Sequence, residues 1–483
     1  MRTSLFSIIL LILASALTAS AAGPKHEFRG AWMHTVYQEQ YSRQSTDANK
    51  KYLRDQLDKL KAAGVNAVIF QVRPSADAFY PSTLEPWSRF LSGKAGKAPA
   101  PLWDPLQFMI DEAHARGMEL HAWLNPYRVT TSKNEVLPKG HIALREPGRV
   151  VKYADGKIYF DPGRPENRRF IAGVVGDIVR RYDVDGIHFD DYFYPYPAGK
   201  AQFPDDASYR KYGNGLKRDD WRRRNVDLLI EEVHDTIRAD KPWVRFGISP
   251  FGIWRNKTSD PKGSATNGLE NYDALYADVL LWAEKGWIDY LMPQVYWPLD
   301  HKAAAYRVLT PWWDSMTPEN CHLYIGQDVE RTMNADELIP KLELMASGER
   351  TKGLCWWPAY SVTSDFGGIA RRLADTALHG TPALVPPYPW LSHKAPSGVR
   401  NLHHDRGTLR WSAPAPKGKA DDAVRFVVYR FDSAREADIS RADAIAGVTS
   451  GAHFDVPGPG AYVVTALSRV NNESKPSEII IVK

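Results

Sequence analysis

The sequence predicts a (β/α)8 TIM barrel, an α/β fold, followed by a small all-β sandwich. Strand-and-helix units repeat eight times between residues 28 and 378, a proline-rich stretch follows, and only short alternating strands come after it. The 483 residues exceed one ordinary core, so a large barrel with an appended domain fits the length. We expect the barrel over 27–380, a linker over 381–395 and the sandwich over 396–483.

Each unit begins with an apolar run typical of a buried strand and continues with apolar residues at helical spacing. The expected strands are 28–34, 65–73, 118–125, 184–190, 243–249, 288–296, 321–327 and 353–357. The expected helices are 46–63, 104–116, 165–182, 218–239, 272–285, 301–316, 335–346 and 366–378. Glycines 64, 117 and 286 follow three of these helices, where a C-cap needs a positive φ. A doubly wound sheet shares this rhythm but rarely reaches eight regular units.

Composition narrows the class of partner. The formal net charge is +5 and no basic stripe is visible, so we expect no nucleic-acid partner. No Cys/His spacing suggests a zinc site, and we expect neither metal nor cofactor. Cys321 and Cys355 fall in neighbouring predicted strands and could bridge in an oxidising compartment, but we favour two buried free thiols.

The first 22 residues have the order of a secretory signal. Arg2 gives a positive start, 6–17 form a short apolar run, and 20–22 (SAA) offer a small-residue cleavage site. The run is too short for a comfortable membrane span, no cysteine for lipid attachment lies near the cleavage site, and no other segment could span a membrane. We therefore expect a periplasmic or secreted protein.

The stretch 184–197 (VDGIHFDDYFYPYP) is the centre of the predicted barrel. It begins as a buried strand and breaks into aromatics and prolines, and Asp190 and Asp191 stand side by side at the break. Barrel enzymes place their active sites at the carboxyl ends of the strands. The acids could instead cap a following turn. The functional interpretation gains support from the other strand ends.

Side chains at or near the strand ends are rich in amides, aromatics and acids, without a phosphate-gripping glycine motif. Ser249, Gln327 and Trp356 are among them. The residues that we expect to bind substrate are His34, Gln71, Arg73, Trp123, Asn125, His188, Tyr192, Gln294, Tyr296, Trp297 and Trp357. A polar rim is ordinary in a barrel, but so many tryptophans beside water are not, and their flat faces suit sugar rings.

Glycoside cleavage needs a proton for the leaving oxygen and a group that stabilises a positive anomeric carbon. Adjacent Asp190 and Asp191 emerge on different sides of the chain and cannot flank one bond as acid and nucleophile. They suit a 2-acetamido sugar that supplies its own nucleophile, with Asp191 as general acid and Asp190 orienting the acetamide. The catalytic residues that we predict are therefore Asp190 and Asp191.

Six motifs in barrel order resemble the glycosyl hydrolase-like 10 family of bacterial barrel proteins. They are FRGAW at 28–32, FQVRP at 70–74, AWLNP at 122–126, GIHFDDY at 186–192, GISPFG at 247–252 and MPQVYW at 292–297. The resemblance covers about 27–380 and implies an exported glycan hydrolase; some members cut peptidoglycan strands stripped of their peptides. It implies a polysaccharide partner, with cell-wall glycan favoured. The missing lipid-attachment cysteine departs from the anchored members.

Two other readings stay open. A different polysaccharide could be cleaved by one acid of the pair and a distant carboxylate such as Asp328, or the barrel could bind glycan without cutting it. Beyond the linker, WSAP at 411–414, FVVYR at 426–430 and YVVTAL at 462–467 resemble a fibronectin type III sandwich. Its strands are expected at 398–402, 408–412, 423–431, 461–469 and 477–482.

Overall fold

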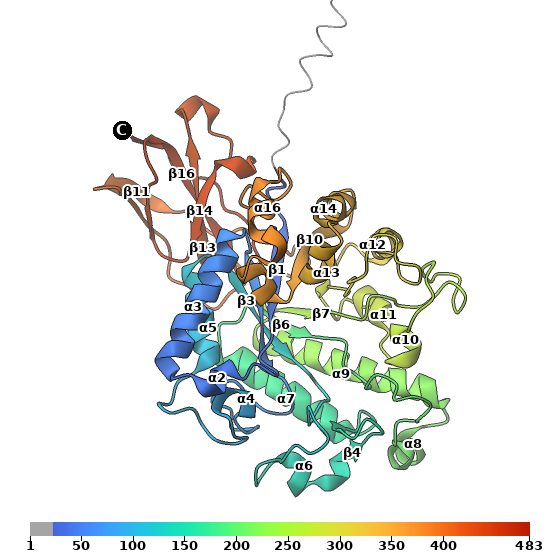
Figure 1. The fold of residues 1–483 in the computed structure, drawn as a ribbon. Coiled ribbons are helices and arrows are strands. Elements are labelled where there is room, and N and C mark those ends of the chain that lie inside the picture. Colours follow the sequence, from blue (N-terminus) through green and yellow to red (C-terminus); the bar gives the residue numbers. More distant parts are fainter. Residues whose placement is uncertain (1–22) are drawn as a thin grey trace, which may run out of the picture.

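The computed structural model describes residues 23–483 as a barrel and an all-β part that pack against each other (Figure 1). The predicted signal, 1–22, lies outside the described residues. Within 23–483 no helix is long and apolar enough to cross a membrane. Both cysteines, Cys321 and Cys355, are buried and unbridged, as favoured from the sequence.

The predicted (β/α)8 barrel is confirmed: eight parallel strands close into one sheet. In order around the barrel they are β1 (Phe28–Met33), β2 (Ala67–Arg73), β3 (Glu119–Leu124), β6 (Gly186–Phe189), β7 (Arg245–Ile248), β8 (Tyr290–Leu291), β9 (His322–Asp328) and β10 (Thr351–Trp357). Closure comes from β1 pairing with β10, with Phe28 opposite Gly353. All carboxyl ends therefore meet at one end of the barrel.

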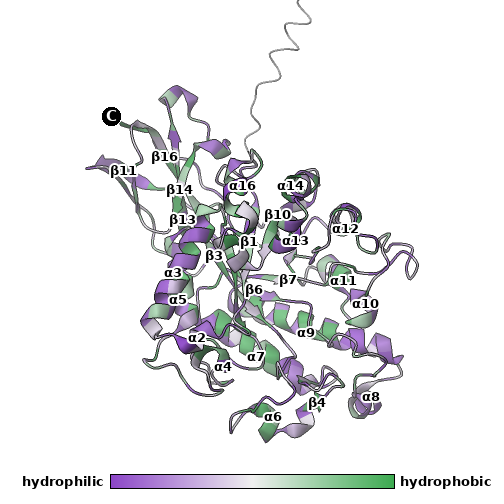
Figure 2. Cartoon of the chain, viewed as in Figure 1, coloured by the Kyte–Doolittle hydropathy of each residue, from purple (hydrophilic) through white to green (hydrophobic). Residues whose placement is uncertain are grey.

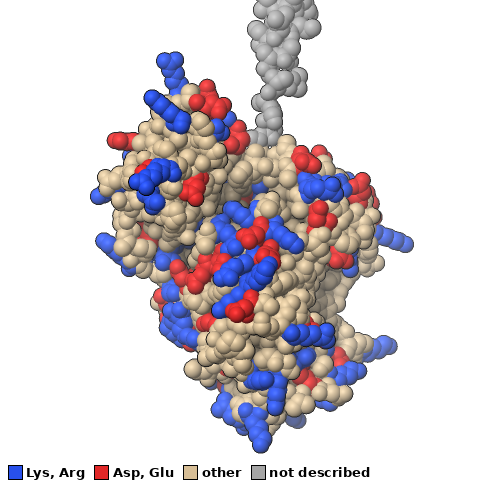
Figure 3. Space-filling view, turned by 60° about the vertical axis from the view of Figure 1, so that its left-hand side comes forward, with Lys and Arg blue, Asp and Glu red and all other residues tan. Residues whose placement is uncertain are grey.

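Helices cover the outside of the sheet, and in Figure 2 α7 and α9 show a hydrophobic and a hydrophilic side. The larger ones are α3 (Thr46–Ala62), α5 (Pro105–Ala115), α7 (Pro165–Arg181), α9 (Arg218–Asp240), α12 (Tyr306–Met316) and α14 (Leu338–Ala346). Local chemistry sets their starts: Asp104 accepts a hydrogen bond from the Gln107 N–H (3.1 Å), and Pro105 occupies the first turn. Ion pairs join α3 to α5, including Arg54 with Glu112, and Figure 3 shows both signs of charge interspersed on one face.

Four expected helices differ in their bounds. The helix expected at 272–285 is two short ones, α10 (Asn271–Ala274) and α11 (Val279–Glu284), and 301–316 becomes helical only at Tyr306. A short helix, α13 (Val329–Asn334), precedes α14 and was not predicted. The helix expected at 366–378 is divided into η2 (Phe366–Gly368) and α16 (Ile369–Asp375), because Gly367 and Gly368 adopt positive φ and interrupt it, and α15 (Ala359–Thr363) precedes them and was not predicted.

Loops at the carboxyl ends of the strands carry further elements. They are α2 (Gln40–Arg43), α4 (Arg89–Ser92), α6 (Ile142–Arg145), η1 (Pro147–Arg149), the hairpin of β4 (Val150–Lys152) and β5 (Ile158–Phe160), and α8 (Asp206–Tyr212). Figure 1 shows α6 and β4 at the end of the molecule opposite the all-β part. The long insertions thus lie around the end where the strands present their last residues.

The all-β part consists of two antiparallel sheets. One is β11 (Arg400–Asp405), β12 (Thr408–Ser412) and β15 (His453–Asp455); the other is β14 (Ile445–Thr449), β13 (Ala423–Phe431), β16 (Gly460–Ser468) and β17 (Ile480–Val482). The short 3-10 turns η3 (Ala434–Glu436) and η4 (Ala442–Ala444) lie between β13 and β14. Strands β14 and β15 were not predicted. The fibronectin type III likeness and the domain boundaries stay predictions.

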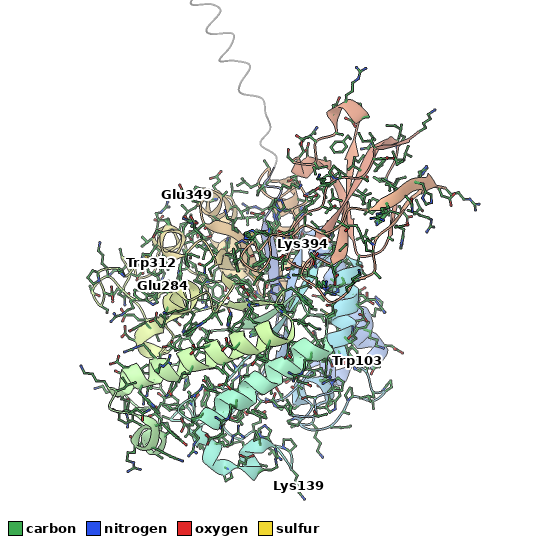
Figure 4. The ribbon with its side chains drawn as sticks, turned by 180° about the vertical axis from the view of Figure 1, so that it is seen from behind. Trp103, Lys139, Glu284, Trp312, Glu349 and Lys394 are labelled. Atoms are coloured by element: carbon green, nitrogen blue, oxygen red, sulfur yellow. The ribbon has the colours of Figure 1, made fainter. Side chains whose placement is uncertain are left out.

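The segment expected as a linker is packed against the barrel. Leu384 accepts a backbone bond from Glu27 (2.9 Å), and the hydroxyl of buried Tyr388 lies 2.6 Å from that of Tyr324. Lys394, labelled in Figure 4, lies where the all-β part meets the barrel, and its carbonyl accepts a bond from Asn472. The two parts are therefore joined by many specific contacts.

Candidate active site

Asp190 and Asp191 follow β6 directly and lie together at the carboxyl end of the barrel. Each is 3% exposed. They share a cavity of about 230 Å³ whose wall is drawn from strand ends all around the barrel. Its lining residues are Trp32, His34, Val36, Tyr37, Gln71, Trp123, Arg128, Asp190, Asp191, Tyr192, Ser249, Gln294, Tyr296 and Trp357.

Asp190 is held by three hydrogen-bond donors. The Trp123 indole N–H (3.1 Å) and the Asn125 side-chain amide both donate to Oδ2, and the Tyr192 backbone N–H donates to Oδ1 (3.2 Å). Burial, and then the charge of Asp191, raise the pKa of Asp190 to about 7. Two adjacent acids titrate as a pair, so the raised pKa belongs to the two groups together.

Asp191 has fewer partners. The Tyr196 hydroxyl donates to its Oδ2, and burial raises the pKa of Asp191, while Tyr196, Gln294 and Arg128 oppose the rise. Three donors thus face Asp190 and one side-chain hydroxyl faces Asp191, while the pKa of both acids is raised. The pair therefore combines a carboxyl group held by three donors, Asp190, with one that has fewer partners, Asp191.

Arg128 is the only arginine or lysine among the described residues that line the cavity. Its Nε donates to the Pro74 carbonyl (2.8 Å), its Nη2 donates to Asn125 Oδ1 (2.8 Å), and its guanidinium lies 5.1 Å from the Tyr192 ring centre. Its charge lowers the pKa of both aspartates but does not outweigh their burial. One half-buried cation thus leaves the acid pair able to hold a proton.

Two amides fix the orientation of the Asp190 carboxylate. Gln71 Oε1 accepts from the backbone N–H groups of Thr35 and Val36 (both 2.9 Å), so its Nε2 must donate to Asn125 Oδ1 (2.8 Å). The Asn125 amide nitrogen is then directed at Asp190. The backbone N–H groups of Thr35 and Val36 therefore fix the orientation of the Gln71 amide, which fixes the Asn125 amide so that its nitrogen faces Asp190.

A column of directed hydrogen bonds runs from the cavity wall through the barrel. Trp32 can only donate, so His188 Nε2 accepts (3.1 Å) and its Nδ1–H donates to the Tyr290 hydroxyl (3.0 Å). Tyr290 in turn donates to His121 Nδ1 (2.9 Å), and His121 Nε2–H donates to Glu119 (3.1 Å). Burial lowers the pKa of both histidines, which keeps them neutral in these tautomers.

The structure distributes the predicted substrate-binding residues over three positions. The cavity wall holds His34, Gln71, Trp123, Tyr192, Gln294, Tyr296 and Trp357. Asn125 and His188 lie behind the wall and act on residues in it. Arg73 and Trp297 lie outside it: Arg73 is buried in an ion pair with Glu85 (2.5 Å), and the Trp297 ring packs 5.5 Å from Phe251.

Sequence reasoning missed several residues of the site. Trp32, Val36, Tyr37 and Arg128 line the cavity, and Tyr196 bonds to Asp191. Arg128 stands two positions after the AWLNP motif and Tyr196 inside the central stretch, so both were adjacent to recognised signals. Asp328 is not in the cavity wall; it caps α13 by accepting from the Arg331 N–H (2.8 Å). Within 23–483 no cluster of three His, Cys, Asp or Glu could hold a metal ion.

Comparisons with known proteins found a family, curated relatives and solved structures that resemble this chain. The family model for glycosyl hydrolase-like 10 matches residues 27–340. The chain is 38% identical to glycosyl hydrolase YngK of Bacillus subtilis over 476 residues, covering 94% of this chain and 92% of YngK. It is 44% identical to glycosyl hydrolase DigH of Escherichia coli over 283 residues, 56% of this chain and 64% of DigH. A glycoside hydrolase domain of PgaB from Bordetella bronchiseptica aligns over 75% of this chain and all of that domain, at 13% identity and a TM-score of 0.49.

Proposed function

Because the chain belongs to the glycosyl hydrolase-like 10 family, we propose that it is an exported enzyme that hydrolyses a glycan containing N-acetylhexosamine. The favoured substrate is the peptidoglycan strand, including strands that have lost their peptides. The observation that carries the proposal is the buried pair of adjacent acids, Asp190 and Asp191, in an aromatic cavity. The ordinary use of such a pair is acid catalysis with one proton in place.

The proposed reaction uses the substrate's own acetamide. Its carbonyl oxygen bonds to the anomeric carbon as the glycosidic C–O bond breaks, and Asp191 gives its proton to the departing oxygen. Asp190, fixed by Trp123 and Asn125, holds and polarises the acetamide N–H. Water then attacks the anomeric carbon, returns a proton to Asp191 and restores the acetamide, so the anomeric configuration is retained.

The two-carboxylate alternative has less support. It needs a second carboxylate across the scissile bond, and the described cavity wall contains no carboxylate besides Asp190 and Asp191. Asp328, the candidate partner, is engaged as the cap of α13. A barrel that only binds glycan would need no pair of acids with a raised pKa. Measuring whether the protein cleaves a glycan distinguishes this alternative from both hydrolytic mechanisms.

The test is to incubate the protein with intact and peptide-free peptidoglycan and to identify the products by mass spectrometry. Asp190→Asn and Asp191→Asn should each lower kcat by about 10²–10⁴-fold, the usual contribution of general acid catalysis. Asp328→Asn is the matched control and should keep the wild-type kcat. If both pair variants fold and cleave at the wild-type rate, the acids are structural and the proposal is wrong.

Export is part of the proposal and has its own test. We place the protein in the periplasm or outside the cell, with 1–22 removed as a signal. All residues of the cavity wall fall within the proposed barrel domain, 27–380, so the all-β domain would take no part in the chemistry. Sequencing the amino terminus of the protein from its native host should begin near residue 23; a start at Met1 would contradict export.

A further inference from the structure

Tyr37 is an unusual residue at the mouth of the cavity. Its side chain lines the cavity, yet the residue is 60% exposed. Its backbone has a φ of 61°, a left-handed conformation that bulky residues rarely adopt and that clusters at binding sites. An aromatic ring kept in water on a strained backbone calls for an explanation other than packing.

The Tyr37 ring is held rigidly. Its hydroxyl donates to the Thr131 carbonyl (3.0 Å), and its edge meets the Phe90 ring at 5.7 Å and 78°. The Arg89 guanidinium lies 4.1 Å from the centre of the same Phe90 ring, so Phe90 is itself held in place. A ring that is already immobilised loses little rotamer entropy when a ligand stacks on its open face.

A second hollow, of about 420 Å³, adjoins the supports of Tyr37. It is lined by Arg89, Gly93, Lys94, Ala95, Ser132, Asn134, Glu135, Val136, Leu137 and Pro138. One wall of this hollow comes from residues 89–95 and the other from 132–138, so Phe90 and Thr131, which hold Tyr37, lie in or next to these segments. Arg89 joins the two walls by donating to Thr131 Oγ1 (2.8 Å) and to Glu135 (3.1 Å). We call this hollow the outer groove. Lys139 follows Pro138 of the outer groove and is labelled in Figure 4, where it lies at the end of the molecule far from the all-β part.

The outer groove has the surface chemistry of a carbohydrate track. Lys94, Ser132 and Asn134 offer donors and acceptors for hydroxyls, and Val136, 83% exposed, offers an apolar contact. The inner cavity is small and enclosed by aromatics, so a polymer bound there must leave it across the mouth. Tyr37 lines the cavity and donates to Thr131, which is bonded in turn by Arg89 of the outer groove, so Tyr37 connects the two hollows.

We propose that Tyr37 is a stacking platform for the sugar ring next to the one in the cavity, and that the outer groove takes the following rings. The inference rests on the proposed function and deepens it: the substrate is a linear glycan chain engaged at several successive rings. The apolar face of a pyranose lies flat on an aromatic ring, as aromatic side chains prefer for apolar partners. Longer chains should therefore bind more tightly than short ones.

The experiment compares chain lengths. Tyr37→Asn removes the ring but tolerates the left-handed backbone, and Tyr37→Phe keeps the ring without the hydroxyl. For long oligosaccharides of the cleaved glycan, Tyr37→Asn should lower kcat/KM about 10-fold, a typical loss for one aromatic stacking contact. For the shortest cleaved oligosaccharide its kcat/KM should stay within about 2-fold, and Tyr37→Phe should resemble the wild type throughout.

The control is Leu102→Ala, which removes another exposed apolar side chain, 70% exposed, away from the cavity and should leave kcat/KM unchanged at every chain length. An equal loss at every chain length, or none, would overturn the platform. Failure of the wild type to cleave any glycan would instead reject the proposed hydrolysis. In that case calorimetry with the same peptide-free strands still decides the inference, since Tyr37→Asn must weaken binding of long strands only.

Discussion

Each end of the barrel buries a pair of carboxyl groups, but the pKa values of the two pairs are shifted in opposite directions. At the amino ends of the strands the pKa of Glu119 and of Asp185 is lowered, whereas at the carboxyl ends the pKa of Asp190 and of Asp191 is raised. All four are at least nine-tenths buried. The difference lies in the cations beside them, so burial alone does not make a carboxylate catalytic.

At the amino end, arginines surround the acids. Burial alone would raise the pKa of Glu119, but Arg245 and Arg425 lower it to about 2. Arg425 comes from the all-β part and donates to both Asp185 (2.9 Å) and Glu119 (3.0 Å). At the carboxyl end the described cavity wall has one half-buried cation, Arg128, for two acids. Two arginines for two acids keep the carboxylates at the amino end ionised, and one half-buried cation for two acids leaves the pKa of the pair at the carboxyl end raised.

Removing Arg425 should produce the largest effect on stability. Arg425→Met leaves Glu119 and Asp185 buried with less compensation, and breaking a buried ion pair from one side costs about 3–5 kcal/mol. Chemical denaturation of the full chain measures this loss. Arg430→Met, in the same strand but exposed, is the control and should stay within about 0.5 kcal/mol of the wild type. Equal unfolding midpoints for the two variants would show that the amino-end network contributes nothing.

The pH dependence of stability should have opposite signs at the two ends. Asp190 has a folded pKa near 7, above its usual 3.8, so its contribution is present at low pH and is lost as pH rises towards 7. Asp190→Asn removes the titrating group and its charge repulsion on Asp191, so the variant should gain stability relative to the wild type as the pH rises from about 4 to 7. Denaturation curves at several pH values measure the difference.

Glu119→Gln supplies the converse. The pKa of Glu119 is near 2, below its usual 4.5, so its stabilising contribution is present above pH 4.5 and is lost as pH falls towards 2. The variant should be less stable than the wild type at neutral pH and approach it in acid. Parallel curves for Asp190→Asn and Glu119→Gln would contradict the contrast between the ends.

The smallest expected effect concerns two tryptophans at the carboxyl end of the barrel, Trp357 and Trp297. Trp357 lines the cavity, with its ring 4.7 Å from that of His34, whereas Trp297 packs against Phe251. Trp357→Ala should raise KM about 5-fold, which corresponds to about 1 kcal/mol of stacking. Trp297→Ala should lower the melting temperature with KM unchanged. Steady-state kinetics and thermal melts of both variants make the test, and a rise in KM for Trp297→Ala alone would reverse the assignment.

The sequence predicted the barrel well because each strand is a continuous buried apolar run and each helix keeps its apolar spacing. It failed where tertiary contacts decide. Residues 272–285 have helical spacing, but Tyr276 adopts a φ of 55° between α10 and α11 and breaks the helix. Strand β14 is short and contains Gly447, which leaves no alternating pattern to detect; it forms because it pairs with β13.

The site was predictable in its residue types more than in its contacts. The acid pair and most of the cavity wall follow from the rule that barrel strands present their last residues to one end. Arg128, Tyr37 and Tyr196 reach the site from loops, whose paths no periodicity encodes. Arg73 and Trp297 stand at strand ends but turn towards Glu85 and Phe251, a choice that depends on partners far away in the chain or in neighbouring loops.

The hydrogen bond between Arg425 and Glu119 has a consequence for the chain during its synthesis. The two residues are 306 positions apart, so the first half of the barrel is synthesised long before its charge can be balanced. Any chain that stops before Arg425 leaves Glu119 and Asp185 short of a cation, at a cost comparable to the whole stability of a typical domain. We therefore expect chains that end before Arg425 to unfold more readily, and to be cleaved more readily by proteases, than the full chain.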